Sequence, residues 1–334
     1  MTHERGEMPF AERTCTVAMY HYIRDTAHTP FPRLHALGLD TFEAQLDFLG
    51  CARRIIAYGD FESGLEGGSL PAKASLLTFD DGVRDHYDVV SRLVARGVQG
   101  VFFVSGDTVA AMPRVLNVHK VHFLVAACGA EALLERLTKT LLPQHAPLVA
   151  GDSSSLEAAP PELYRYDGRA ARSVKRLLNY ALPLDFATGL LTDLFEEQFG
   201  SETTFARDLY LSPAMIVEMS RAGMTFGFHT ETHPVLSRLS AAHQRLELER
   251  GPGLIRELTG QQRVPFCIPH GHRSSYNSDT VAMLAELGYS LAFTAVRAVT
   301  DYAPASRFEI PRLDTKDMPP FTDVAGLLPV TAST

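Results

Sequence analysis

The sequence predicts a parallel α/β fold, open or closed, interrupted by a long helical segment. Seven short apolar runs read as strands, and amphipathic runs of helical period separate most of them. This alternation is typical of a parallel sheet covered by helices. Between the third and fourth strands it stops for nearly a hundred residues, which is more than a simple connection needs. With 334 residues and 46% hydrophobic content, the chain can bury a core of barrel size.

The expected strands are brief and apolar. They cover residues 15–23, 74–79, 100–104, 224–228, 264–268, 291–295 and 308–313. Before the interruption, helices are expected at 39–56, with Thr41 as N-cap, and at 85–97, which ends at a glycine. A glycine-rich loop is expected at 64–68. After the interruption, helices are expected at residues 213–222, 241–258 and 278–287.

The interruption itself carries helical patterns and a loop rich in serine, proline and glycine. The helical patterns cover 117–141, 170–181 and 186–199, and the loop covers 151–161. We therefore expect residues 10–112 and 208–320 to form the α/β unit, and 113–207 to form a helical insertion or cap. Residues 1–9 and 321–334 are expected to be flexible tails.

Composition excludes several classes of function. A net charge of −8, a pI near 5.9 and the absence of a basic stripe argue against nucleic acid as a partner. The polar N-terminus lacks the apolar core of a signal peptide, and no apolar run reaches membrane-spanning length. The four cysteines are scattered and form no Cys-x-x-Cys pair. These features favour a cytoplasmic protein and leave a homo-oligomer open.

Two stretches far apart in the sequence carry the chemistry. Residues 76–82 (LLTFDDG) and 226–234 (FGFHTETHP) each begin as an apolar strand and end in residues that bind metals or move protons. Two imidazoles and one carboxylate can hold a divalent ion with a position left for water. The second carboxylate is then free to accept a proton. We expect His229 and His233 to share one face of a helical turn, and the Thr230 hydroxyl to stabilise the loop.

These stretches resemble the signature motifs of a known family. Residues 78–82 (TFDDG) and 229–234 (HTETHP) are similar to the first two motifs of the polysaccharide deacetylases, carbohydrate esterase family four. Residues 266–271 (FCIPHG) resemble the family's Phe-x-x-Pro-Tyr-Gly segment, and the order matches. The resemblance covers roughly 10–110 and 208–315. It implies a distorted (β/α)₇ TIM-like barrel with the helical insertion between its third and fourth strands.

The resemblance also implies roles for site residues. Asp81, His229 and His233 correspond to the metal ligands, and Asp80 to the general base that takes a proton from metal-activated water. One divalent ion is expected, Zn²⁺ by default, while Fe²⁺, Co²⁺ or Ni²⁺ also suit this ligand set. A backbone N–H near His270 is expected to donate to the developing oxyanion.

The sequence departs from the family pattern in several places. The arginine that helps to orient the base two residues before the motif-three proline is replaced by Cys267. The Leu-x-His that supplies the general acid near the C-terminus has no counterpart, because residues 310–314 read IPRLD. The chain also contains no tryptophan, so the usual fourth motif is missing.

Other residues are candidates for the missing acid and for substrate contacts. His21 ends the first strand and points the same way as Val17 by strand alternation. His119 and His122 share a helix face in the insertion. Three residues are candidates for substrate contacts, Arg312 as a partner for a substrate anion together with His270 and Tyr276. For His270, which replaces a tyrosine common in the family, structural packing is the alternative.

The sequence thus predicts a metal-dependent hydrolase that removes an N-acetyl group from an amino sugar or sugar-containing metabolite. The expected substrate is an N-acylated amino sugar, free or linked to a nucleotide or lipid. One alternative is a deformylase or another C–N hydrolase on the same scaffold. Another is a non-catalytic sugar-binding homologue, which the missing C-terminal histidine keeps open.

Overall fold

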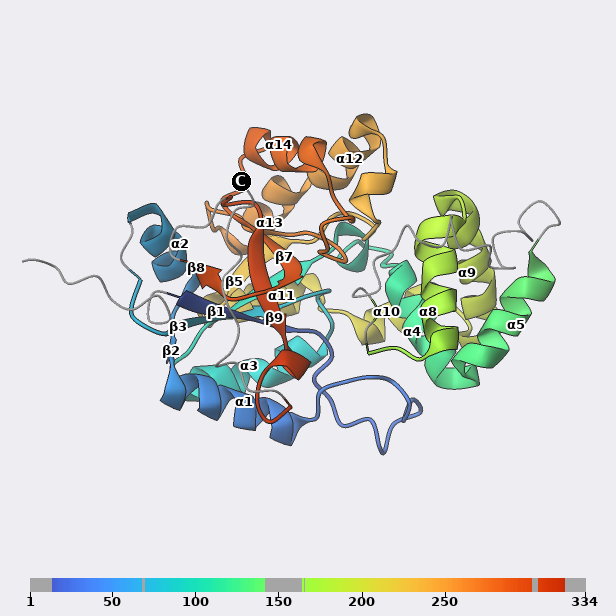
Figure 1. Cartoon of the computed structure of the whole chain (residues 1–334), viewed down its shortest axis with the longest axis horizontal. Coiled ribbons are helices and arrows are strands. Elements are labelled where there is room, and N and C mark those ends of the chain that lie inside the picture. The colour runs from blue at the N-terminus through green and yellow to red at the C-terminus, as the bar shows by residue number, and fades with distance from the viewer. Residues whose placement is uncertain (1–13, 68–69, 142–163, 165, 302–305, 322–334) are drawn as a thin grey trace, which may run out of the picture.

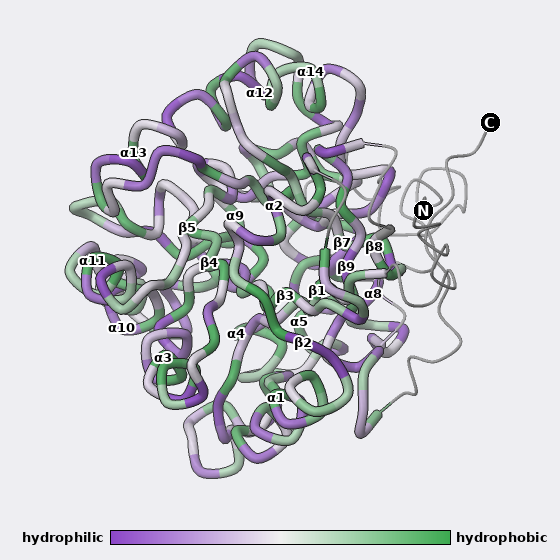
Figure 2. The backbone as a smooth tube through the Cα atoms, turned by 90° about the vertical axis from the view of Figure 1, so that its left-hand side faces the viewer, coloured by the Kyte–Doolittle hydropathy of each residue, from purple (hydrophilic) through white to green (hydrophobic). Residues whose placement is uncertain are grey.

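Seven parallel strands close into a barrel in the computed structural model, which describes residues 14–67, 70–141, 164, 166–301 and 306–321. The barrel strands are β1 (Thr14–Tyr20), β3 (Ala74–Phe79), β4 (Gly100–Val104), β5 (Thr225–Phe228), β6 (Phe266–Cys267), β7 (Ala292–Arg297) and β9 (Ile310–Asp314). The ring runs β3-β4-β5-β6-β7-β9-β1 and closes where β1 pairs with β3 (Figure 2). All seven strands lie where they were predicted, and the (β/α)₇ barrel is confirmed.

Two further strands lie outside the closed ring. Strand β2 (Arg54–Ile55) runs parallel to β3, and β8 (Thr300–Asp301) runs antiparallel to β1. Neither was predicted, because a two-residue strand leaves no periodic signal.

Alternation along β1 separates the inside of the barrel from its outer face. Cys15 and Val17 belong to the cluster that fills the barrel. Tyr20 belongs to the cluster between strands and helices, and its ring meets that of Phe42 at 5.2 Å. Met19 continues the inward series, so His21 is directed toward the mouth of the barrel, as predicted.

Helices cover the outside of the barrel. They are α1 (Leu39–Ala52), α3 (Asp85–Ala95), α11 (Pro213–Arg221), α12 (Ala241–Leu248), α13 (Gly251–Thr259) and α14 (Ser278–Glu286). Helix α2 (Tyr58–Gly67) instead adds Tyr58 and Phe61 to the cluster that fills the barrel. Figure 1 shows α1 and α3 on one side of the barrel and α12 and α14 on the other. The predicted loop at 64–68 is wrong for 64–67, which ends α2, because tertiary packing overrides the low helix propensity of glycine. The N-cap of α1 is Gly38 instead of Thr41.

The helical insertion lies between β4 and β5, the third and fourth barrel strands, as predicted. Its described helices are α4 (Asn117–Cys128), α5 (Ala130–Thr140), α8 (Arg169–Arg176) with a π-helical extension (Leu177–Ala181), α9 (Leu184–Phe199) and α10 (Glu202–Leu209). They gather beside the barrel in Figure 1 and bury a hydrophobic cluster of their own. Gly129, with a φ of 88°, divides the helix predicted over 117–141.

Some predictions fall partly or wholly outside the described residues. These are the loop at 151–161 and most of the two tails. The domain limits at 112/113 and 207/208 stay predictions. Among the helices that the structure describes, none is both long and apolar enough to cross a membrane.

Candidate active site

The two predicted motifs meet at the carboxyl ends of the barrel strands. Asp80 and Asp81 follow β3, and His229 and His233 follow β5. All four residues are buried. Because parallel strands of a barrel end on the same face, residues about 150 positions apart in sequence come together there.

The loop that carries the two histidines is not helical, so the expected helical turn is wrong. Thr230 and His233 adopt left-handed backbone conformations, with φ of 64° and 60°. The Thr230 hydroxyl accepts the His233 N–H at 2.9 Å, which confirms that it stabilises the loop. A tightly bent loop, instead of a helix face, brings the two imidazoles together, with ring centroids 4.7 Å apart.

Asp81 and the two imidazoles form a set of converging ligand atoms. His229 Nδ1 donates to the Cys267 carbonyl at 2.7 Å, which leaves Nε2 as the nitrogen that can face a cation. The Nε2 atoms of His229 and His233 each lie 3.4 Å from Asp81 Oδ1. That oxygen is buried and accepts no hydrogen bond from any described residue. An orphaned carboxylate oxygen between two imidazoles fits a divalent cation.

Charges around Asp81 keep it ionised. Burial alone would raise the pKa of its carboxyl, but His119, which donates to Oδ2 at 3.0 Å, and the two other imidazoles hold the pKa well below its usual range. A metal ligand must be deprotonated, so the carboxylate is ready to bind a cation.

Backbone strain is concentrated at the site. Five non-glycine residues have positive φ in the part of the chain that the structure describes, and four belong to the site loops. These four are Asp81, Thr230, His233 and His270. Such conformations cluster where a loop is shaped for function. Gly271 has the same requirement, since a Cβ there would lie 2.3 Å from the Ala295 backbone nitrogen.

Asp80 is held by Arg312 of β9. Arg312 donates from Nη1 to Oδ1 at 2.8 Å and from Nη2 to Oδ2 at 2.7 Å, and from Nε to the Thr294 carbonyl at 2.7 Å. Burial would raise the pKa of the Asp80 carboxyl, but the guanidinium lowers it below its usual value. Arg312 is 1% exposed. We therefore correct its expected role, because its donors are occupied by the barrel and not free for a substrate anion.

The position of Arg312 in the sequence also fits a partner within the barrel. Arg312 lies at an inward position of a strand, two residues after Ile310 of the barrel core. A buried arginine needs a carboxylate partner, and Asp80 ends the strand β3 on the same face. The pairing spans 232 positions, and only closure of the barrel brings β9 within reach of the β3 end.

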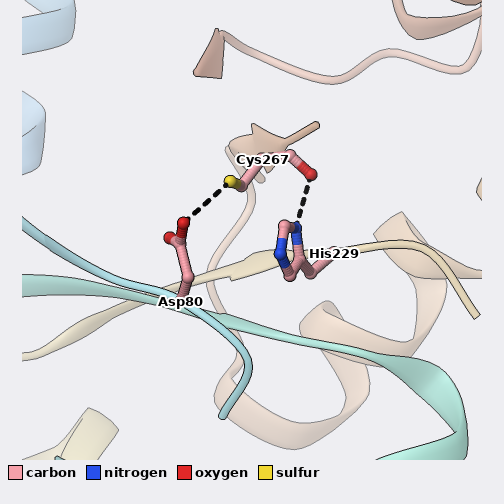
Figure 3. A group of neighbouring side chains, drawn as sticks. All are labelled: Asp80, His229 and Cys267. Atoms are coloured by element: carbon pink, nitrogen blue, oxygen red, sulfur yellow. Dashed lines mark hydrogen bonds between the residues drawn. The ribbon is translucent and has the colours of Figure 1, made fainter. Parts of the chain in front are cut away.

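Cys267 lies between Asp80 and His229 (Figure 3). Its thiol donates to Asp80 Oδ2 at 3.5 Å, and its carbonyl accepts a hydrogen bond from His229 Nδ1. Arg312 Nη2 lies 3.1 Å from the sulfur. The arginine that the family pattern places at this position is thus replaced by one from another strand.

Two of the remaining candidates line the cavity at the site, and two do not. His21 Nε2 lies 3.9 Å from Asp80 Oδ2 with 42% of its side chain exposed, and the His270 ring is 4.9 Å from that of His233. Both line the cavity at the site. Tyr276, expected at the substrate, instead packs in the core and donates to Glu309 at 2.8 Å, outside the cavity lining. His119 is fully buried against Asp81.

Two adjoining cavities open onto the site. One, of about 710 Å³, is lined by Asp80, Asp81, His21 and insertion residues such as His122. The other, of about 460 Å³, extends between the insertion and the loop after β5. They share three lining residues, Val118, His233 and His270. Cavities of this size accept small ligands.

Comparison with known proteins agrees with the motifs. A model of the polysaccharide deacetylase family matches residues 187–292, a segment that contains His229, His233 and His270 but not the two aspartates. No curated protein matches the sequence.

Several solved structures share the fold. The deacetylase PplD of Streptococcus pyogenes, in complex with acetate, has a TM-score of 0.55 and 17% identity, covering 90% of this chain and 92% of that one. The deacetylase domain of BpsB from Bordetella bronchiseptica has a TM-score of 0.54 and 17% identity, with coverage of 92% and 98%. IcaB from Ammonifex degensii has a TM-score of 0.52 and 19% identity, with coverage of 90% and 91%. At these identities the likeness shows the fold.

The fold and the site together define a class, an α/β barrel with paired aspartates and paired histidines at the carboxyl ends of its strands. Within that class, the resemblance to the polysaccharide deacetylases that the three motifs predicted is confirmed.

Proposed function

We propose that this protein is a metal-dependent hydrolase that removes the N-acetyl group from an amino sugar or a sugar-containing metabolite. The observation that carries the proposal is the buried Asp81 Oδ1, which lies 3.4 Å from the Nε2 atoms of His229 and His233 and accepts no hydrogen bond from the part of the chain that the structure describes. Asp80 lies beside this set and is not needed to complete it.

Asp81, His229 and His233 would hold one divalent ion, and Zn²⁺ is the default for two imidazoles and a carboxylate. When bound, such an ion polarises an amide carbonyl and makes a water molecule more acidic. The ligand set also suits Fe²⁺, Co²⁺ and Ni²⁺.

Asp80 serves as the general base. Its carboxylate is kept ionised by Arg312, and its two oxygens are fixed by a bidentate contact. A fixed, ionised carboxylate can accept the proton of the attacking water without first changing its orientation. A backbone N–H near His270 supports the oxyanion in this scheme, at the bend where that residue turns left-handed.

His21 delivers the proton to the departing nitrogen. Amide hydrolysis needs an acid there, and His21 is the histidine that lines the cavity beside Asp80 while retaining solvent access, with 42% of its side chain exposed. Solvent access lets the imidazole recover its proton after each turnover. His21, at the end of β1, thus takes the place of the missing C-terminal histidine as the general acid.

The substrate proposal is an N-acetylated amino sugar, free or linked to a nucleotide or lipid. The two adjoining cavities support a substrate that extends beyond one sugar ring. An anionic part of it could meet Arg273, which lines the larger cavity. The other two arginines of that lining are engaged, Arg312 with Asp80 and Arg297 with Asp317.

The test is acyl release from a panel of N-acylated nucleotide sugars and soluble glycan oligomers. We expect acetate from at least one compound, loss of that activity after chelation, and recovery on adding Zn²⁺. Release of formate instead would assign the deformylase alternative. A metal-free protein that hydrolyses as fast as the loaded one would reject the mechanism, and sugar binding without turnover would favour the non-catalytic alternative.

A further inference from the structure

The helical insertion contacts the metal-ligand set through the side chain of His119. His119 lies in the first turn of α4 and is 0% exposed. Its Nε2 is 3.0 Å from Asp81 Oδ2, and its Nδ1 is 2.6 Å from the hydroxyl of Tyr210, the residue that ends α10. Both ring nitrogens are therefore occupied, and His119 lines neither cavity. This placement corrects its expected role as a proton donor to the substrate.

The hydrogen-bond directions along this chain follow from counting protons. The Leu116 N–H donates to the Tyr210 hydroxyl oxygen at 2.9 Å. Tyr210 has one proton to give, and it goes to His119 Nδ1. In the neutral imidazole the proton then resides on Nε2 and is donated to Asp81 Oδ2. With Oδ2 engaged from the insertion side, Oδ1 faces the two ligand imidazoles.

Backbone pairing fixes Tyr210 relative to Asp81. Val83 and Tyr210 form an antiparallel bridge, in which the Arg84 N–H donates to the Leu209 carbonyl at 2.7 Å and the Leu211 N–H donates to the Gly82 carbonyl at 2.9 Å. The end of the insertion is thus joined to the loop that immediately follows Asp81. Ring packing adds to this, since the His119 ring lies 5.3 Å from Tyr22 and 5.5 Å from Tyr210.

We propose that His119 and Tyr210 are positioning residues for Asp81, through which the insertion sets the protein's affinity for its divalent ion. Neither residue touches the cavities, and both act through the orientation of one carboxylate. The inference rests on the proposed function only in taking Asp81 as a ligand. Partners that orient a ligand in this way commonly contribute 10- to 100-fold to metal affinity.

The experiment measures Zn²⁺ affinity of the full-length protein by competition with a chromogenic chelator, without any substrate. Tyr210→Phe removes the hydroxyl, and we expect affinity to fall about 10-fold. His119→Phe removes both hydrogen bonds, and we expect a fall of about 100-fold. His119→Gln keeps an N–H donor near Asp81, so it should recover part of that loss. The Co²⁺-loaded variants should also show an altered visible absorption spectrum.

Tyr289→Phe is the matched control. Tyr289 is equally buried and donates its hydroxyl proton to the Leu248 carbonyl at 2.6 Å, away from the cavities. It should lose stability comparable to Tyr210→Phe in the metal-free state but keep wild-type Zn²⁺ affinity. If His119→Phe fails to fold, Tyr210→Phe and His119→Gln still decide the question.

The outcomes distinguish this inference from the proposed function. If the wild-type protein binds no divalent ion, Asp81 is not a metal ligand and both proposals are wrong. A wild type that binds Zn²⁺, with Tyr210→Phe and His119→Gln variants that bind it equally well, overturns the positioning role alone. Weaker binding in the two variants but not in Tyr289→Phe supports it, whether or not a substrate has been found.

Discussion

Asp80 and Asp81 are adjacent in the chain, yet they are held by different regions of the molecule. The barrel holds Asp80, through the guanidinium of Arg312 on β9. The helical insertion holds Asp81, through the imidazole of His119 on α4. One contact is a buried ion pair within the barrel, and the other is a hydrogen bond from a segment packed around its own core. The base and the metal ligand can therefore be disturbed separately.

The largest effects are expected from replacing the two aspartates, and they should differ between Asp80 and Asp81. Asp80→Asn removes the base, so kcat should fall by about 10²- to 10⁴-fold while Zn²⁺ content stays at the wild-type level. Asp81→Asn should lose the ion as well as the activity, because a neutral amide is a poor replacement for a charged ligand. Acetate release and metal analysis on the same preparations check both. If Asp80→Asn also loses the ion, the two aspartates do not have separate roles. Asp88→Asn, on the exposed face of α3, is the control.

The next effect concerns the barrel side. Arg312→Leu leaves Asp80 as an unpaired buried carboxylate, and we expect a loss of about 3–5 kcal/mol in the free energy of unfolding at neutral pH. Arg312→Lys keeps the charge without the bidentate contact and should lie between this variant and wild type. Urea denaturation of the metal-free protein measures both.

Arg245→Leu is the control for that experiment. Arg245 pairs with Glu286 at 2.6 Å on the surface of the protein, with side chains 38% and 61% exposed. Removing it should cost less than about 1 kcal/mol. Equal losses for Arg312→Leu and Arg245→Leu would show that the barrel contact is no stronger than a surface pair.

A third prediction concerns the acid. His21→Ala should lower kcat by about 10²-fold, with unfolding free energy within about 0.5 kcal/mol of wild type, because the side chain lies at the cavity mouth with 42% of its surface exposed. Added imidazole should restore part of the rate. Unchanged kcat would remove His21 from the mechanism and return the search to His122, which lines the same cavity.

The smallest effect tests whether the outer helices influence either aspartate. Asn277 caps α14 in a capping box with Thr280. Asn277→Ala should cost about 1 kcal/mol of stability and leave kcat and Zn²⁺ affinity unchanged. A change in either would mean that the base and the ligand respond to the whole barrel instead of to their own neighbours.

Much of the fold was predictable from the sequence because its signals are local. Each barrel strand is a short apolar run, and most helices show a 3.6-residue period. The failures come from tertiary context. Residues 64–67 are helical in spite of their glycines, and α10, which Tyr210 caps at its C-terminal end, is too short for its helical pattern to be recognised.

The site was predictable only as far as its motifs extend. Asp80, Asp81, His229 and His233 are marked by strand ends rich in ligands, and the structure brings them together. The partners that hold them are single residues in otherwise ordinary elements. Arg312 was assigned to the substrate and His119 to proton transfer, because sequence order does not reveal which barrel strands become neighbours or how the insertion docks.

The left-handed backbone at Asp81, His233 and His270 has a consequence for anyone who redesigns this centre. Exchanging one donor atom for another, for example His233→Cys to favour a softer ion, also changes a residue in a conformation that costs most L-amino acids about 1–2 kcal/mol. A weakened variant would then confound coordination chemistry with loop geometry. Glycine and asparagine tolerate the left-handed backbone. A variant with either residue at the same position therefore loses the donor atom without straining the loop, and it serves as the reference.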